Sequence, residues 1–161
     1  MGLNTMWVKR FAGIAGAVGF VVATAPVASA DPPPAAEEMH DLPIAQGHYT
    51  TNLQGDFYRK YFKTPDGRFC AILPNGGPVG CDAAPRDAPA GSNQTVVNAG
   101  FPAEYKHADT PFFTRDVDVL PVGYRLENWG ASCGLVREGV LTCTTYGSHG
   151  FTISADHGEL W

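Results

Sequence analysis

The densest group of side chains able to do chemistry lies near the C-terminus, in the stretch "TYGSHGFTISADHGE". Ser148, His149 and Asp156 are the residue types of the nucleophile, the base and the orienting acid of a hydrolase. Ser148 and His149 are adjacent, however, so on an extended backbone they point to opposite faces. Ser148 also does not stand in the G-x-S-x-G turn that presents the serine in many hydrolases. We therefore assign no catalytic residue and keep a small hydrolase built on this region as a second hypothesis.

Metal ligation is the other chemistry that this stretch could support. His149, Asp156 and His157 offer imidazole and carboxylate ligands if the loop at residues 155–156 folds back. No H-x-x-x-H or H-E-x-x-H pair is present to hold two imidazoles on one face. The glycines around His149 favour a turn histidine whose ring hydrogen-bonds the backbone. The sequence thus predicts neither a metal nor another cofactor.

The loop "YGSHGF" is nevertheless the best candidate for a ligand-binding site. Its glycines let the backbone approach a ligand closely, and His149 can change charge near neutral pH. Tyr146 offers a face for stacking, and Asp156 or His157 would assist if the following strand ends at the same rim. The alternative is that the glycines only make a turn between two strands.

Four cysteines, at positions 70, 81, 133 and 143, offer redox, metal or disulfide chemistry. A redox centre usually has a C-x-x-C spacing, and a zinc site usually has two ligands two to four residues apart. Neither spacing occurs in the chain. The spacing instead favours two local disulfides, Cys70–Cys81 and Cys133–Cys143, each stabilising the fold by roughly 3 kcal/mol in the chain-entropy account.

Hairpins must hold these cysteines in register. "DFYRKYFKTPDGRFCAIL" reads as two strands around a Pro-Asp-Gly turn. In "CGLVREGVLTC", a three-residue loop with Gly139 in the left-handed region would place Val136 opposite Val140 and Cys133 opposite Cys143. A further strand is expected over residues 151–154, where Phe151 and Ile153 alternate with polar residues.

These elements predict the fold class. Gly, Pro, Asp and Asn recur every several residues, and no stretch sustains a helical apolar period over three turns. We expect an all-β domain over residues 47–161, with about five to seven short antiparallel strands in a small sandwich or half-open barrel. The aromatic run around Phe57, Tyr58, Tyr61 and Phe62 suits half-buried strands, with a carbohydrate-stacking platform as the minor alternative. Trp129 is expected to pack beside the Cys133–Cys143 bridge.

The N-terminal third has a different character. Lys9 and Arg10 precede an apolar stretch of about 15 residues and the motif Ala28-Ser29-Ala30, which is typical of a Sec-type signal peptide over residues 1–30. A membrane-spanning helix needs about 20 apolar residues, so we expect cleavage after Ala30 and no stable membrane span. Residues 31–46 are rich in Pro, Ala and acid, and are predicted to be a disordered tether.

Charge narrows the choice of partners. The chain has 11 Lys and Arg against 16 Asp and Glu, a net charge of −5, which becomes −7 when residues 1–30 are removed with Lys9 and Arg10. Nucleic acid and anionic membranes are poor partners for such a chain. The remaining candidates are an extracellular protein or a glycan.

Three segments also carry a recognisable pattern: "FKTPDGRFCAI", "VGCD" and "LPVGYRLENWGASCGLVREGVLTCTTYGSHGFTIS". Over about residues 62–154 this pattern resembles a family of small secreted actinobacterial and proteobacterial domains of unknown function. The signal peptide and the proline-rich segment are similar to those of mycobacterial exported proteins. The resemblance implies a disulfide-stapled domain that is secreted or held at the cell wall, and it supplies no catalytic residues. The leading hypothesis is therefore a secreted, non-enzymatic module of the cell envelope or its exterior that binds a protein or a glycan.

Overall fold

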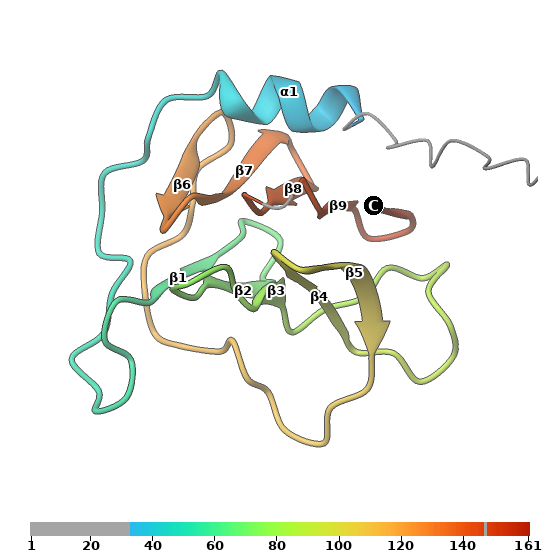
Figure 1. The fold of residues 1–161 in the computed structure, drawn as a ribbon, viewed down its shortest axis with the longest axis horizontal. Helices are drawn as coiled ribbons and strands as arrows, with labels where there is room; N and C mark the ends of the chain where they lie inside the picture. The colour runs from blue at the N-terminus through green and yellow to red at the C-terminus, as the bar shows by residue number, and fades with distance from the viewer. Residues whose placement is uncertain (1–32, 147) are drawn as a thin grey trace, which may run out of the picture.

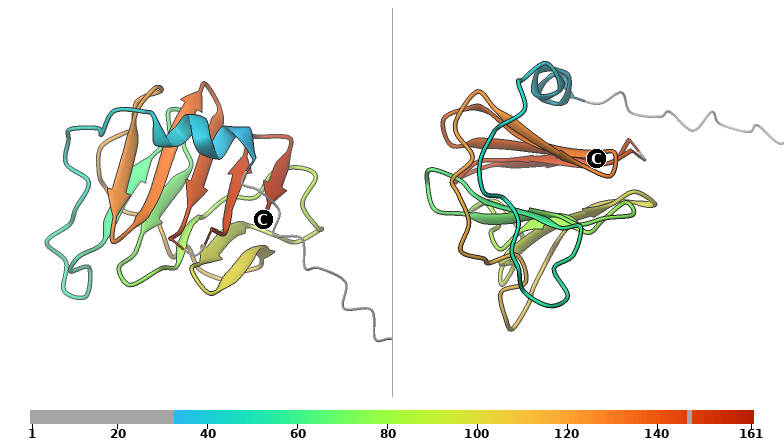
Figure 2. Two further views of the ribbon diagram at one scale, coloured as in Figure 1. Left: turned by 45° about the horizontal axis from the view of Figure 1, so that its top comes forward. Right: turned by 90° about the vertical axis from the view of Figure 1, so that its left-hand side faces the viewer.

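The computed structural model describes residues 33–146 and 148–161. The predicted signal peptide lies outside the described residues. The chain forms two stacked five-stranded antiparallel sheets with one short helix above them (Figures 1 and 2). The expected all-β sandwich is confirmed. The described residues form ten strands and not the expected five to seven, because short polar edge strands add to both sheets.

Each sheet is a meander in which consecutive strands are neighbours. The first sheet contains β1 (Lys60–Lys63), β2 (Phe69–Ile72), β3 (Val79–Cys81), β4 (Gln94–Asn98) and β5 (Phe101–Lys106). The second sheet contains β6 (Arg125–Asn128), β7 (Ala131–Arg137), β8 (Val140–Thr144), β9 (Gly150–Ile153) and β10 (Gly158–Leu160). The helix α1 spans Pro34–His40.

The two predicted hairpins are present. β1 and β2 pair across the turn that contains Gly67, with Phe62 opposite Cys70. β7 and β8 pair with Cys133 opposite Cys143. The predicted pairing of Val136 with Val140 is wrong: a β-bulge between Leu135 and Arg137 shifts the register, so Arg137 faces Val140 across a two-residue turn.

Both predicted disulfides form, each between the second and third strands of its sheet. Cys70–Cys81 joins β2 to β3, and Cys133–Cys143 joins β7 to β8, with Cα atoms 4.0 and 4.1 Å apart. All four cysteines are buried between the sheets among residues such as Phe62, Leu135 and Phe151. Each bridge therefore lies in the core and joins two neighbouring strands of its own sheet.

The long connection between β5 and β6 passes beneath the first sheet (Figure 1). It brings Phe113 and Val117 against Tyr61, Ala71 and Val96, which form a second apolar cluster on the outer face of that sheet. The first sheet is thus covered on both faces.

Helix α1 corrects the prediction of a disordered tether over residues 31–46. It lies on the outer face of the second sheet (Figure 2), and its Ala36 and Met39 are buried. Gly134 of β7 makes room for it, because a Cβ atom there would lie 2.7 Å from the Met39 Cγ atom. Ile44 then forms a parallel bridge with Arg125. The sequence did not predict this docking, because the segment begins with three consecutive prolines and its apolar face is short. Within the described residues, none of the helices has the length and apolar content needed to cross a membrane.

The connections between consecutive strands lie at two opposite ends of the sandwich. One end carries the segment before β1 and the β2–β3, β4–β5, β6–β7 and β8–β9 connections. We call it the aromatic end, because Tyr58, Trp129 and Tyr146 lie there exposed. The other end carries the remaining turns, where Arg68 donates hydrogen bonds to the carbonyl oxygens of Gly139 and Ile153 and so ties the sheets together.

Candidate ligand-binding site

The structure separates the residues that the sequence grouped as one candidate site. Tyr146 and His149 precede β9 and lie at the aromatic end, whereas Asp156 and His157 lie in the turn between β9 and β10 at the other end. The expectation that Asp156 or His157 would lie beside His149 is therefore wrong, because the whole of β9 runs between them. Gly147 lies outside the described residues.

His149 is held in a turn by its backbone. Its carbonyl oxygen accepts hydrogen bonds from the backbone N–H and the hydroxyl of Thr145 (2.9 and 3.1 Å). Ser148, with φ of 63°, donates its backbone N–H to the carbonyl oxygen of Thr145. Among the described residues, no hydrogen bond joins the Ser148 hydroxyl to an imidazole. The Ser-His-Asp arrangement of the hydrolase hypothesis is not assembled in this geometry.

Asp156 and His157 have partners of their own. Asp156 forms an ion pair with Arg86 (2.8 Å), and His157 Nδ1 contacts a carboxylate oxygen of Asp87. All of these side chains are largely exposed, and such pairs contribute little to stability. Within residues 33–146 and 148–161, no three His, Cys, Asp or Glu side chains come together as metal ligands would.

Two aromatic residues at the aromatic end hold a backbone conformation that bulky residues rarely adopt. Tyr58 has φ of 62° and Trp129 has φ of 51°, and their side chains are 75% and 52% exposed. Their rings meet edge to face, with centroids 6.1 Å apart and planes at 80°. A left-handed backbone costs a residue with a Cβ atom roughly 1–2 kcal/mol. An exposed ring regains little of this cost by burial, so these two positions are strained outliers.

The strain at Trp129 arises from the turn that joins β6 to β7. Trp129 and Gly130, with φ of 51° and 75°, are the two turn residues between Asn128 and Ala131. Two-residue hairpin turns of this left-handed kind prefer Asn-Gly, because Asn tolerates positive φ. The chain places Trp where Asn is favoured and thereby presents the indole at the tip of the hairpin.

The Asn128 side chain holds the segment that carries Tyr58 close to Trp129. Its side-chain amide donates to the carbonyl oxygens of Tyr58 (2.8 Å) and Ile72 (2.9 Å). One side chain therefore links the second sheet to β2 and to the segment that carries Tyr58. The positions of Tyr58 and Trp129 relative to each other are set by this link as well as by ring contact.

A shallow groove lies beside the Trp129 ring. It is widely open to solvent, has a volume of about 470 Å³ and is lined by Ile44, Lys60, Glu127, Asn128 and Trp129. One carboxylate oxygen of Glu127 accepts a hydrogen bond from Arg125 (2.7 Å). Among the described residues, neither the Lys60 ammonium nor the other Glu127 oxygen has a hydrogen-bond partner. The groove therefore offers one donor group and one acceptor beside an aromatic surface.

Tyr146 extends the aromatic surface beyond Trp129. It is 63% exposed, and a Cβ atom on Gly130 would lie 3.4 Å from its ring. Its hydroxyl lies so close to Gly76 that a Cβ atom there would be 2.5 Å away. Glycine is required at position 76 by this approach and by its φ of 86°. The loops at this end thus contact one another and form a continuous surface.

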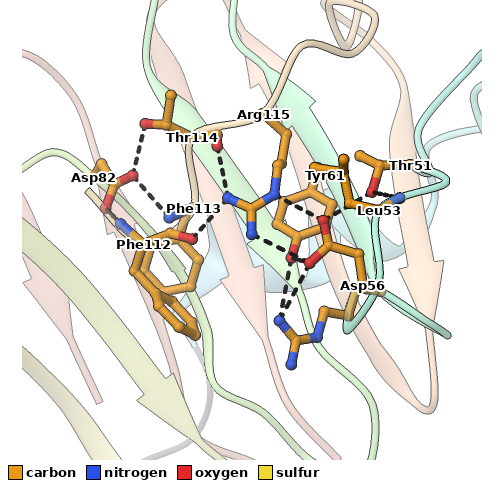
Figure 3. Close-up of polar contacts among 10 residues, drawn as sticks. Thr51, Leu53, Asp56, Tyr61, Asp82, Phe112, Phe113, Thr114 and Arg115 are labelled. Carbon is orange, nitrogen blue, oxygen red and sulfur yellow. Dashed lines mark hydrogen bonds and ion pairs between the residues drawn. The ribbon is translucent and has the colours of Figure 1, made fainter. Parts of the chain in front are cut away.

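The most extensive buried polar cluster serves the fold (Figure 3). Asp56 is only 4% exposed, and both of its carboxylate oxygens are saturated. Arg115 donates to both oxygens (2.7 and 3.2 Å), and the hydroxyls of Thr51 and Tyr61 add hydrogen bonds of 2.8 Å. The Arg115 guanidinium also lies 4.8 Å from the centre of the Tyr61 ring. The hydrogen bonds from Arg115, assisted by those from Thr51 and Tyr61, hold the pKa of Asp56 well below its ordinary value, although burial opposes this shift. A saturated carboxylate of low pKa is a poor base, so we assign this cluster to structure.

A second aspartate, Asp82, also anchors the β5–β6 connection (Figure 3). Asp82 accepts hydrogen bonds from the backbone N–H groups of Phe112 and Phe113 and from the Thr114 hydroxyl, at 2.8 to 2.9 Å. Gln94 donates to it as well. These contacts hold the Phe113 ring against the outer face of the first sheet.

Sequence reasoning missed the groove residues Lys60 and Glu127, and it expected Trp129 to pack on the disulfide. The indole instead projects from a turn, away from the buried Cys133–Cys143 bridge. The available signal was the order Asn128-Trp129-Gly130, in which a bulky residue interrupts an Asn-Gly turn. Comparisons of the chain with protein-family models, curated proteins and solved structures find no match.

Proposed function

We propose that this chain is a non-enzymatic binding module of the extracytoplasmic space and that its ligand site is the aromatic end. One observation carries the proposal: Tyr58 and Trp129 keep exposed rings on left-handed backbone, in contact with each other. Strain of this kind persists where the surrounding structure enforces it, and it clusters at ligand-binding and active sites.

The architecture supports this assignment. Binding residues are often carried on loops that a rigid scaffold positions, and β-sandwiches commonly use the loops at one end. Here the scaffold has a disulfide inside each sheet, and loops of both sheets meet at the aromatic end. Exposed aromatic residues are also enriched in the parts of surfaces that dominate binding energy.

The two disulfides are consistent with an oxidising, extracytoplasmic compartment. We further propose that the chain is exported by its signal peptide and that the mature protein begins at Asp31. Mass spectrometry of the protein from culture medium or cell wall should find Asp31 as the first residue. Membrane-bound protein that retains residues 1–30 would contradict export with cleavage.

A comparison of three mature chains tests the site: wild type, Trp129→Asn and Tyr124→Asn. Tyr124 is 41% exposed and lies beside β6 at the other end of the sandwich, so it is a matched aromatic control. Each folded chain is incubated with an isolated cell-envelope fraction, and the bound share is measured after sedimentation. We expect wild type and Tyr124→Asn to bind equally and Trp129→Asn to lose at least nine-tenths of binding. Equal binding by all three chains would overturn the proposed site.

A further inference from the structure

We propose that the groove at the aromatic end binds a neutral oligosaccharide, with one sugar ring stacked on Trp129 and its hydroxyls held by Lys60 and Glu127. This inference rests on the proposed function, since it names the ligand class of the same site. Its first support is the arrangement of the rings. A pyranose has an apolar C–H face and a polar rim, so its ideal partner is a flat, exposed and fixed aromatic face.

The indole of Trp129 meets these requirements. It is half exposed, and its backbone is fixed by the hairpin turn and by the Asn128 side chain, which binds both Tyr58 and Ile72. The Tyr58 ring stands at 80° to the indole. The Tyr58 ring does not line the groove, but its edge-to-face contact supports the indole from the side. A fixed site loses little conformational entropy on binding, which favours affinity for a small ligand.

The polar lining matches the rim of a sugar. Of the five side chains that line the groove, three are polar and two are apolar: Lys60, Glu127 and Asn128 against Ile44 and Trp129. Neighbouring sugar hydroxyls can donate one hydrogen bond and accept another at the same time. The Lys60 ammonium supplies donors, and the free oxygen of Glu127 supplies an acceptor. An apolar peptide segment would leave both charged groups without partners, at a cost in free energy.

The charge of the site selects among glycans. Lys60 and Glu127 carry opposite charges, and Glu127 is also neutralised by its ion pair with Arg125 (2.7 Å). The whole chain carries a net charge of −5. With Arg125 included, the charged groups at the groove sum to +1, but the acidic chain around it repels a polyanion, so a sulfated or uronic acid polymer is disfavoured. A neutral sugar satisfies the hydrogen-bonding groups without adding charge.

Titration calorimetry with defined sugars tests the inference. The probes are a neutral tetrasaccharide of β-1,4-linked N-acetylglucosamine and one of α-1,6-linked mannose, each added to the mature chain. We expect at least one to bind at a single site. Trp129→Asn should weaken that binding at least tenfold, since it removes the stacking surface. Lys60→Met, which keeps an unbranched side chain of similar length and removes the charge, should weaken it several-fold, and Tyr124→Asn should leave it unchanged.

The outcomes separate this inference from the proposed function. Binding of either sugar that disappears with Trp129→Asn supports the glycan assignment. Failure of both sugars to bind, while the envelope fraction still binds in a Trp129-dependent manner, overturns the neutral-glycan inference and leaves the aromatic end as a site for another class of ligand, such as a protein. Sugar binding that is unaffected by Trp129→Asn also overturns the inference, because the sugar then binds elsewhere.

Discussion

Trp129 shows how a single residue can favour binding over local stability. Its left-handed backbone costs about 1–2 kcal/mol in a residue with a Cβ atom, and Asn would adopt the same turn more readily. Its contact with Tyr58 returns about 0.5–1.5 kcal/mol. The two effects nearly cancel, so the indole is a poor choice for stability alone.

This balance gives a prediction for the free energy of unfolding. Trp129→Asn should change it by less than about 1 kcal/mol, measured by urea denaturation, because relief of strain offsets loss of the ring contact. Trp129→Val should lower it by about 1–3 kcal/mol, since a β-branched residue tolerates positive φ poorly. If Trp129→Asn lowered stability by about 3 kcal/mol or more, as loss of a core tryptophan does, the indole would be a packing residue.

Asp56 shows the opposite case, a polar residue whose interactions serve the fold. Asp56→Asn removes the charge and replaces one of the two acceptor oxygens with an amide group, so Arg115 loses one of its two acceptors inside a nearly buried cluster. We expect the free energy of unfolding to fall by about 2–4 kcal/mol in urea denaturation. Asp116→Asn is the control, because that carboxylate is fully exposed in its pair with Lys63 and should leave stability unchanged. Equal effects of the two substitutions would contradict the structural role of the Asp56 cluster.

The pH dependence of stability provides an independent check on Asp56. Its folded-state pKa is lowered, chiefly by Arg115, from an ordinary value of 3.8. The resulting stabilisation is complete above that ordinary pKa and is lost as the pH falls further below it, because protonation then favours the unfolded chain. The unfolding free energy of wild type should therefore decline below about pH 4 more steeply than that of Asp56→Asn. Parallel declines would exclude Asp56 as a source of acid sensitivity.

The disulfides act at the scale of the strand pair. Cys133–Cys143 joins two strands that already face each other in register, so the bridge acts mainly by restricting the unfolded chain. Replacement of both cysteines by Ala should lower the free energy of unfolding by about 2–4 kcal/mol. The matched pair is Cys70 and Cys81, which should give a similar loss when replaced. A loss of less than about half a kcal/mol would show that the bridge contributes little.

The packing of helix α1 on the second sheet gives a second prediction for a single structural element. Met39 is buried against Gly134, whereas Glu38 on the same helix is exposed. Met39→Ala should lower the free energy of unfolding by about 2–3 kcal/mol, while Glu38→Ala should have little effect. The measurement is urea denaturation combined with limited proteolysis of residues 33–48. Equal stability and equal cleavage in the two variants would restore the disordered tether that the sequence indicated.

At the level of the whole molecule, some features of the fold could be predicted from local sequence patterns and others could not. Cysteine spacing and turn residues such as Gly139 are local signals, and they were sufficient to predict both disulfides and the two hairpins. Helix α1 depends on space above Gly134, ninety-five residues from Met39, which no local pattern records. Strand β5 was missed for a related reason: its side chains are largely exposed, so it lacks an apolar face.

The candidate site was predicted only in part, for the same reason. Tyr146 and His149 do lie at the aromatic end, but Asp156 and His157 were grouped with them by sequence proximity alone. Lys60, Glu127 and Trp129 come from two sheets, so only the stacking of the sheets brings them together. The part of the site formed by Lys60, Glu127 and Trp129 therefore depends on the whole sandwich.

One measurement tests most directly whether the aromatic end is the ligand site. Two-dimensional ¹H–¹⁵N NMR spectra of the mature chain are recorded with and without the envelope fraction, and line broadening is mapped onto the fold. We predict that broadening centres on the Trp129 indole N–H and on the backbone amides of residues 58–60, 75–77 and 127–131. Broadening confined instead to Arg86, Asp156 and His157, at the other end of the sandwich, would contradict the account.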